Sequence, residues 1–320
     1  MSKLRKKAFL ILIFFLMVLD SHVFSFDKKV TVAVIKSRDI APYNTSLEGF
    51  TKVLKEKGFD AEFLKYDMKG NKDEGHRIAG EVKAGKPDIV LTIGSLSTEI
   101  AQQDIKDLPL VFCMILNPVA SGLVSSMESP GNNLTGASMD IPIRQQFENL
   151  KLIFPNMKRI GVVYNPRETG VVVEQASTVA KGMGFELVCR EVNSEKEIPQ
   201  AIEDLGKSID VLWSVADSTV FTPQSTQYII LYSLRNKLPF MGLSASYVKA
   251  GALLALSSDE RDIGRQAGET AAEILSGKKP EELPVTVPQK ILLSLNMRVA
   301  DQIGVKIPSD MVNRAKEVFR

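Results

Sequence analysis

The sequence repeats itself over a distance close to the length of one domain. Four segments of the first half recur in the same order in the second half, at offsets of 122 to 130 residues. A period of this length predicts two similar lobes, and the small drift in the offsets is expected to fall in loops. Two lobes on one chain enclose a cleft, and lobes that hinge can trap a small ligand there. The paired segments are Lys29 to Ile35 with Lys158 to Tyr164, Gly58 to Asp67 with Gly184 to Asn193, Asp88 to Ile93 with Asp210 to Val215, and Leu108 to Phe112 with Leu238 to Gly242.

Length and composition agree with two lobes. The chain has 320 residues, of which 44% are hydrophobic and 24% charged. Because a single hydrophobic core stops growing at roughly 250 to 300 residues, a chain of this length is expected to form two domains.

Residues 1–25 predict a signal peptide for export. Four basic residues precede an uninterrupted apolar run of 12 residues from Ala8 to Leu19, and Val23-Phe24-Ser25 offers a cleavage site after Ser25. A helix that spans a bilayer needs about 20 apolar residues, so the run favours a cleaved signal over a retained anchor. No cysteine lies near this cleavage site, so lipid attachment there is not expected. The mature protein is therefore expected to be free in the periplasm.

The predicted cleavage changes the net charge. The signal carries four of the 40 Lys and Arg residues and one of the 38 Asp and Glu residues, which leaves 36 basic and 37 acidic residues and a net charge of −1. This balance implies no basic patch for nucleic acid or anionic lipid.

Strand-like runs rich in Val, Ile, Leu and Phe alternate with stretches of helical spacing along the whole chain. Examples of the helical spacing are Leu47 to Leu54 and Ala176 to Met183. Such alternation predicts an α/β fold of two Rossmann-like lobes, each with a parallel sheet covered by helices on both faces. The expected strands are Val30 to Ile35, Ala61 to Tyr66, Ile89 to Ile93, Leu110 to Cys113, Ile160 to Tyr164, Glu186 to Arg190, Val211 to Val215 and Leu253 to Leu256.

Ligands of open parallel sheets bind outside the carboxyl ends of the strands. That rule selects six loops, which are rich in small hydroxyl residues and each lead into a helix. The candidate ligand-binding residues in them are Arg38, Tyr43, Gly94, Ser95, Ser97, Thr98, Asn117, Asn165, Thr169, Asp217, Ser218, Thr219, Ser244 and Ser246.

The loops after the third strand of each half differ in chemistry. Gly94-Ser95 aligns with Ala216-Asp217, so a neutral loop faces a carboxylate across the predicted cleft. The hydroxyls and free N–H groups from Ser95 to Thr98 can bind a carboxylate or phosphate, and Asp217 can accept hydrogen bonds from an ammonium group. The alternative interpretation is that Ser95 and Asp217 are only N-caps of the helices that follow, worth about 1 kcal/mol each.

Four further residues carry weaker signals. Arg38 can pair with an acidic ligand group, although a surface or structural ion pair is the commoner role. Tyr43 can cover a ligand or pack in the fold, and Asn117 offers an amide but also opens a turn before Pro118. Trp213 is the only tryptophan and lies inside an expected strand, which favours core packing over ligand stacking.

The sequence gives little support for catalysis, metal binding or a cofactor. His76 is the only histidine beyond the predicted signal and lies in a charged stretch, and the chain shows no nucleotide-binding loop or nucleophile elbow. Cys113 and Cys189 fall in different halves, where a disulfide would oppose hinging. We expect two buried free thiols, no catalytic or metal-binding residues and no cofactor.

Several long segments resemble the ABC transporter substrate-binding proteins of the tryptophan- and tyrosine-binding type. The resemblance extends from about Val30 to Pro308, and it implies a type I periplasmic binding protein fold that closes on a small ligand and delivers it to a membrane permease. The segments that carry it are LPLVFCMILNPVASGLV, PGNNLTGASMDIP, FPNMKRIGVVYNPRET, VKAGALLALSSDERDIGRQAGETAAEILSGKKPEELPV and LLSLNMRVADQIGVKIP.

The ligand residues of that family are only partly matched. Asp217 and the hydroxyls of Ser95 and Thr98 match, but Asn117-Pro118 stands where the family has Asp-Pro. The stretch from Glu168 to Val171 lacks the asparagine of the family's Glu-x-Asn-Ser. The resemblance therefore implies an amino acid or amino-acid-like ligand, with a related polar or acidic small molecule as the alternative.

The resemblance also implies three crossings between the lobes. Lobe 1 is then expected to hold residues 28–139 and about 259–290, and lobe 2 residues 140–258 and about 291–320. The expected partners are a small ligand and an ABC permease in the inner membrane, with the protein as a monomer. A periplasmic sensor that signals through a membrane partner is the alternative, whereas an intracellular repressor would need a DNA-binding headpiece and no signal peptide.

Overall fold

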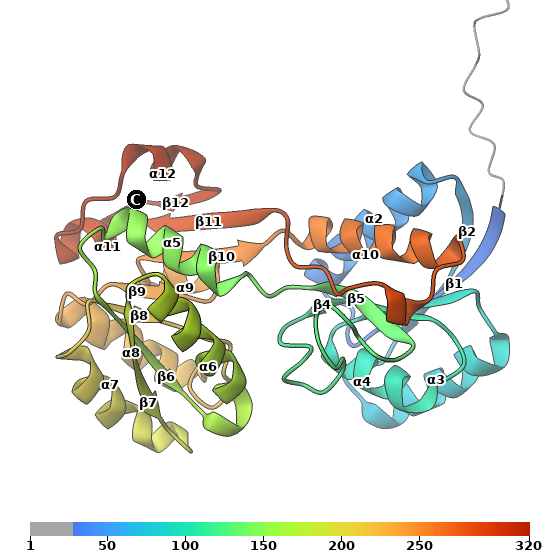
Figure 1. Ribbon diagram of the computed structural model, residues 1–320, viewed down its shortest axis with the longest axis horizontal. Helices are drawn as coiled ribbons and strands as arrows, with labels where there is room; N and C mark the ends of the chain where they lie inside the picture. The colour runs from blue at the N-terminus through green and yellow to red at the C-terminus, as the bar shows by residue number, and fades with distance from the viewer. Residues whose placement is uncertain (1–27) are drawn as a thin grey trace, which may run out of the picture.

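The computed structural model describes residues 28–320, and these form two α/β lobes that lie side by side (Figure 1). The predicted signal peptide lies outside the described residues. Within residues 28–320, no helix combines the length and the apolar character that crossing a membrane requires.

Lobe 1 is built on a parallel sheet of five strands in the order β2-β1-β3-β4-β5. Its strands are β1 (Lys28–Lys36), β2 (Phe59–Asp67), β3 (Ile89–Ile93), β4 (Leu110–Ile115) and β5 (Leu134–Ser138). Its helices are α2 (Ala41–Glu56), α3 (Lys72–Gly85), α4 (Ser95–Asp104), α10 (Glu260–Leu275) and the short 3₁₀ turn η2 (Pro280–Glu282).

Helices cover both faces of this sheet because alternate side chains of its strands point to opposite sides. Val32 and Val34 of β1 belong to the core beneath α2 and α10, whereas Ala33 and Ile35 belong to the core beneath α3 and α4. The late helix α10 lies directly against α2, where a Cβ atom added to Gly264 would stand only 1.7 Å from the carbonyl oxygen of Ser46. Glycine at this position therefore allows the last third of the chain to return to lobe 1.

Lobe 2 is built on a sheet of seven strands in the order β12-β11-β10-β9-β8-β6-β7. Its strands are β6 (Arg159–Tyr164), β7 (Glu186–Glu191), β8 (Val211–Trp213), β9 (Phe240–Gly242), β10 (Leu254–Ser258), β11 (Ile291–Asn296) and β12 (Glu317–Phe319). Its helices are α5 (Ile143–Ile153), α6 (Pro166–Gly182), η1 (Glu195–Glu197), α7 (Ile198–Gly206), α8 (Pro223–Arg235), α9 (Ala245–Ala250), α11 (Met297–Ile303) and α12 (Ser309–Arg314). The core on one face lies beneath α5, α6 and α11, and the core on the other beneath α7 and α8.

The internal repeat corresponds to the first four strands of each sheet. Lobe 1 places them in the order β2-β1-β3-β4 and lobe 2 in the order β7-β6-β8-β9. The predicted α/β fold with two similar lobes is therefore confirmed. The sheet of lobe 2 departs from the predicted parallel arrangement at one pair, because β11 enters from the other lobe and runs antiparallel to β10.

Four short or late strands were not among the strand-like runs, although the repeat segment Leu238 to Gly242 had already marked the position of one of them, β9. They are β5, β9, β11 and β12, and the run that was expected to end at Val215 is a strand only to Trp213. Two of these, β9 and β12, have only three residues each, which is too short for the period-two alternation to show.

Both cysteines are free, in separate lobes. Burial raises the pKa of Cys113 to about 12. Cys189 is only half-buried, so the prediction of full burial is wrong for this residue. It lies in β7, at the edge of its sheet, where one side of the strand has no neighbour.

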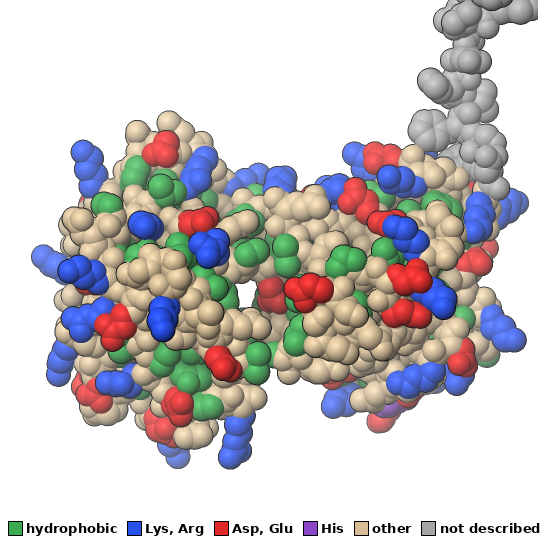
Figure 2. Space-filling view, viewed as in Figure 1, with side chains coloured by type: hydrophobic (Ala, Val, Ile, Leu, Met, Phe, Trp, Pro, Cys, Tyr) green, Lys and Arg blue, Asp and Glu red, His purple; other side chains and the backbone are tan. Residues whose placement is uncertain are grey.

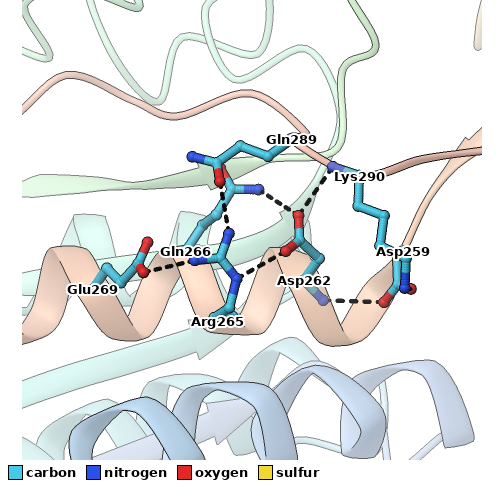
Figure 3. A network of polar contacts seen from close by, with 7 residues as sticks. All are labelled: Asp259, Asp262, Arg265, Gln266, Glu269, Gln289 and Lys290. Carbon is cyan, nitrogen blue, oxygen red and sulfur yellow. Dashed lines mark hydrogen bonds and ion pairs between the residues drawn. The ribbon is translucent and has the colours of Figure 1, made fainter. Parts of the chain in front are cut away.

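Three chain segments connect the lobes: residues 139–142 between β5 and α5, Asp259 between β10 and α10, and residues 287–290 between η2 and β11. A polar network joins the second and third segments (Figure 3). Lys290 Nζ lies 2.5 Å from Asp259, and the Lys290 N–H donates to Asp262 of α10 at 3.1 Å. Arg265 donates to both Asp262 and Gln289. These bonds hold the two segments together beside the start of α10.

Candidate ligand site between the lobes

A cavity of about 460 Å³ lies between the lobes, beside the connecting segments. Figure 2 shows an opening at the waist of the molecule, with hydrophobic and acidic side chains beside it. Lobe 1 contributes the loop after β4 (116–120) and Met127, and the connecting segments contribute 139–142 and Val287. Lobe 2 contributes Gln146, residues of α6, and the ends of β8, β9 and β10.

The walls of the cavity are largely apolar. Trp213 lines it and is only 2% exposed, and its indole N–H donates to Gln146 at 2.8 Å. Exposed apolar side chains face the same space from three directions: Leu116 of lobe 1, Val287 of a connecting segment and Val171 of lobe 2, each at least 40% exposed. Closure of the lobes would remove this apolar surface from water, at roughly 25 cal/mol per Å².

Two carboxylates, Asp140 and Glu260, are the charged side chains of the cavity lining, and no lysine, arginine or histidine of residues 28–320 joins them there. Asp140 lies in the first connecting segment and accepts hydrogen bonds from Asn117 N–H at 2.8 Å and Ser138 Oγ at 2.8 Å. Burial raises the pKa of Asp140 above its ordinary value, because these two bonds only partly offset the loss of water. The site therefore has acidic character.

Asp217, the carboxylate favoured by the sequence, is occupied by its own lobe. It is 2% exposed and does not line the cavity. One oxygen accepts from Asn165 N–H and Thr169 Oγ1, both at 2.7 Å, and the other accepts from Thr219 N–H at 3.1 Å and Val220 N–H at 3.0 Å. Since a carboxylate offers about four acceptor positions, Asp217 has none left for a ligand in this arrangement.

Glu168 of α6 binds the same loop after β8 that contains Asp217. It accepts from Ser218 N–H at 2.5 Å, from Ser218 Oγ at 3.1 Å and from Thr219 N–H at 3.3 Å. Partial burial alone would raise the pKa of Glu168, but these hydrogen bonds outweigh it and lower the pKa below its ordinary value. Asp217 and Glu168 together tie the loop after β8 to the start of α6.

The predicted residues after β3 divide into inward and outward groups. Ser97 and Thr98 are buried and bond within lobe 1, Ser97 with Ser37 and Thr98 with Thr92 and the carbonyl of Gly94. Ser95 is exposed at the start of α4. Gly94 has a φ of 95°, and the Tyr43 hydroxyl approaches it so closely that an added Cβ atom would lie 2.4 Å away.

Of the 14 predicted binding residues, Asn117 and Ser244 line the cavity. Arg38 is exposed and its guanidinium packs beside Gly70. Ligand contact by the remaining twelve stays a prediction. They lie at the carboxyl ends of the strands, either in the loops or in the first turn of the helices that follow: Arg38, Tyr43, Gly94, Ser95, Ser97, Thr98, Asn165, Thr169, Asp217, Ser218, Thr219 and Ser246.

Most cavity residues were not among the predicted binding residues, and three of these bear on the chemistry of the site. Trp213 was assigned to the core, and it serves both roles because β8 ends where the cavity begins. Asp140 follows β5 and Ser258 ends β10. The missed strand β5 hid Asp140, because the rule about the carboxyl ends of strands selects a loop only after a recognised strand.

Comparison with known proteins gives the class of protein that the sequence resemblance implied. The family model of the ABC transporter substrate binding proteins matches residues 29–319, and the chain therefore belongs to this family. A tyrosine-binding protein of Clostridioides difficile is 31% identical over 255 residues, which are 78% of this chain and 73% of that protein.

Solved structures agree with the fold. A substrate binding protein with adhesive properties from Clostridium difficile, in a ligand-free, open structure, has a TM-score of 0.77 and 26% identity, covering 91% of this chain and 99% of that one. An ABC domain from Streptococcus pneumonia in complex with L-Trp has a TM-score of 0.67 and 24% identity, covering 91% and 100%. Membership of this family confirms that the chain is a substrate-binding protein and not an enzyme.

Proposed function

We propose that the protein captures an aromatic amino acid, or a compound like one, in the cleft between its lobes and delivers it to an ABC permease in the inner membrane. The observation that carries this proposal is the cavity of about 460 Å³, with apolar walls from both lobes and two carboxylates at the connecting segments. A volume of this order suits a small organic ligand. The family and its tyrosine-binding relative support the same choice.

The proposal includes export and closure. Residues 1–25 act as a cleaved signal, and the mature protein works as a monomer in the periplasm. Lobe 1 comprises 28–139 with about 259–290, and lobe 2 comprises 140–258 with about 291–320. The lobes move as rigid units about the three connecting segments, and closure brings the loops of both onto the ligand. A sensory role would use the same closure on a different membrane partner.

Trp213 provides a direct test, because it is the only tryptophan of the chain and lines the cavity. L-Tyrosine and L-phenylalanine should change its fluorescence in a saturable way, and L-tryptophan should bind by calorimetry. At 100 times its dissociation constant each should stabilise the protein by about 2.7 kcal/mol. L-Alanine is the control. If none of the three aromatic amino acids binds at millimolar concentration, the proposed ligand class is wrong.

A further inference from the structure

We propose that Asp140 holds the ammonium group of the ligand and that this group, rather than a ligand carboxylate, is the charge that the cavity recognises. This inference rests on the proposed function and narrows its ligand class. It follows from three observations: the charges of the cavity lining, the free hydrogen-bonding capacity of each carboxylate, and one hydroxyl without a partner.

The charged side chains of the cavity lining are all acidic. Asp140 and Glu260 line the cavity, and no basic side chain of the described residues does so. A ligand carboxylate would approach two like charges with no side-chain cation to offset them. An ammonium group would be attracted, and the low dielectric of a closed cleft strengthens that attraction. Both carboxylates lie at the connecting segments, Asp140 in the first and Glu260 directly after the second, so closure of the lobes leaves them beside the cavity.

Hydrogen-bonding capacity separates the two candidate aspartates. The four acceptor positions of Asp217 are taken by four donors of lobe 2. Asp140 has two donors, the Asn117 N–H, which contacts both of its oxygens, and the Ser138 hydroxyl. About two of its acceptor positions are therefore free for an ammonium group.

Ser258 supplies an independent observation. Its side chain is 4% exposed, it lines the cavity, and its hydroxyl has no hydrogen-bond partner in the structure. A buried hydroxyl without a partner is costly, and a ligand donor would satisfy it. An ammonium group has three N–H donors, which suits one carboxylate together with a neutral oxygen acceptor.

The rest of the lining fits an apolar body attached to that ammonium group. Trp213 forms one wall, held in place by its bond to Gln146, and Leu116, Val171 and Val287 complete the apolar surface. The ligand class is therefore an amine with an aromatic or similarly sized apolar body.

Three probes that share a hydroxyphenyl group distinguish recognition of the ammonium group from recognition of the carboxylate. L-Tyrosine carries both groups, tyramine lacks the carboxylate, and 3-(4-hydroxyphenyl)propanoate lacks the ammonium group. Titration of Trp213 fluorescence and calorimetry should show tyramine within about tenfold of L-tyrosine, and the propanoate at least about 30-fold weaker than either, a difference of about 2 kcal/mol.

The variant Asp140→Asn keeps the shape of the side chain and one acceptor oxygen. It should lose about 30-fold or more in affinity for L-tyrosine and tyramine but not for the propanoate, so that the preference for the amine collapses. Asp107→Asn, which changes an exposed aspartate of lobe 1, is the matched control and should behave as wild type. Circular dichroism checks that each variant is folded. If Asp140→Asn does not fold, Ser258→Ala gives the same test with a smaller loss.

The outcomes distinguish this inference from the proposed function. Propanoate binding as tight as tyramine binding, a preference that persists in Asp140→Asn, or failure of tyramine where L-tyrosine binds would each overturn the role of the ammonium group and leave the aromatic cleft standing. If none of the three probes binds at millimolar concentration, the ligand class fails as a whole.

Discussion

Each lobe places an aspartate near the carboxyl ends of its strands, but the two carboxylates have different surroundings. Asp217 of lobe 2 is buried and bonded to four donors of its own loops. Asp140, at the exit from lobe 1, is partly buried, bonded to two donors, and lines the cavity. The hydrogen-bonding capacity left to a carboxylate after folding therefore does not follow from its loop or from its alignment in the repeat.

The largest expected effect comes from Asp217→Ala. Removal of the carboxylate leaves the N–H groups of Val220 and Asn165 and the buried hydroxyl of Thr169 without an acceptor. The Thr219 N–H keeps only its longer bond to Glu168. We expect the free energy of unfolding to fall by about 3 kcal/mol, measured by urea denaturation, because unsatisfied buried groups cost about 1 to 3 kcal/mol each and some regain water.

Asp301→Ala, which changes an exposed aspartate of α11, is the control and should alter stability by less than about 0.5 kcal/mol. Ligand affinity of the folded Asp217→Ala protein should stay within about twofold of wild type. A residue that pairs with a ligand ammonium group would give a different result: unchanged stability and a loss of about 2 to 5 kcal/mol of binding free energy. That result would contradict a purely structural role for Asp217.

The next effect is on ligand binding at Ser258. Ser258→Ala should weaken binding of an amine ligand by about tenfold, since a hydrogen bond to a charged group contributes about 1.5 to 3 kcal/mol and neighbouring acceptors compensate in part. The ligand-free protein should be as stable as wild type or more so, because its hydroxyl has no partner to lose. Calorimetry and thermal unfolding measure the two quantities. Unchanged affinity together with lowered stability would show that the hydroxyl belongs to the fold.

A smaller effect concerns the pH dependence of stability. Burial raises the folded-state pKa of Asp140, so its protonated form suits the folded protein better than its charged form. The stability that this group contributes is present below its unfolded pKa and is lost as the pH rises through the raised folded pKa. Wild type should therefore lose stability relative to Asp140→Asn as the pH rises above about 4, the ordinary pKa of an aspartate, measured by urea denaturation. A difference that is independent of pH would show that Asp140 is not destabilised by burial.

The smallest effect is expected at Asp259, which forms the second connecting segment. Its partner Lys290 is exposed, and exposed ion pairs contribute little. Lys290→Met should change ligand affinity by less than about threefold, and the change should shrink further at high salt. A tenfold change, measured by calorimetry at low and high salt, would instead place this ion pair in control of closure.

Much of the fold could be predicted from the sequence. The recurrence of four strands in order requires two similar sheets, because equal apolar patterns with equal spacing bury equal faces. The return of α10 to lobe 1 could not be predicted from periodicity. It depends on contact between α10 and α2 at Gly264 and Ser46, residues more than 200 positions apart.

The candidate site could likewise be predicted from the sequence only in part. Asn117 and Ser244 follow recognised strands and line the cavity as the strand rule predicts. Asp140 and Ser258 lie beside strands whose ends the sequence did not mark, and Trp213 shows how one side chain can belong to the core and to a cavity wall.

By itself, the sequence determined two duplicated α/β lobes, a cleft between them and a class of binding protein. The lobes and the cleft follow from local patterns and from the repeat, and the class of protein follows from the resemblance of long segments to a known family. Only the tertiary structure decided which carboxylate is free to bind. Asp217 meets two of its donors at the N-terminal end of α6, 48 and 52 positions away, and two in its own loop, 2 and 3 positions away. Asp140 meets only two donors. Because free acceptor capacity depends on contacts between distant segments, aligning one lobe with the other could not reveal it.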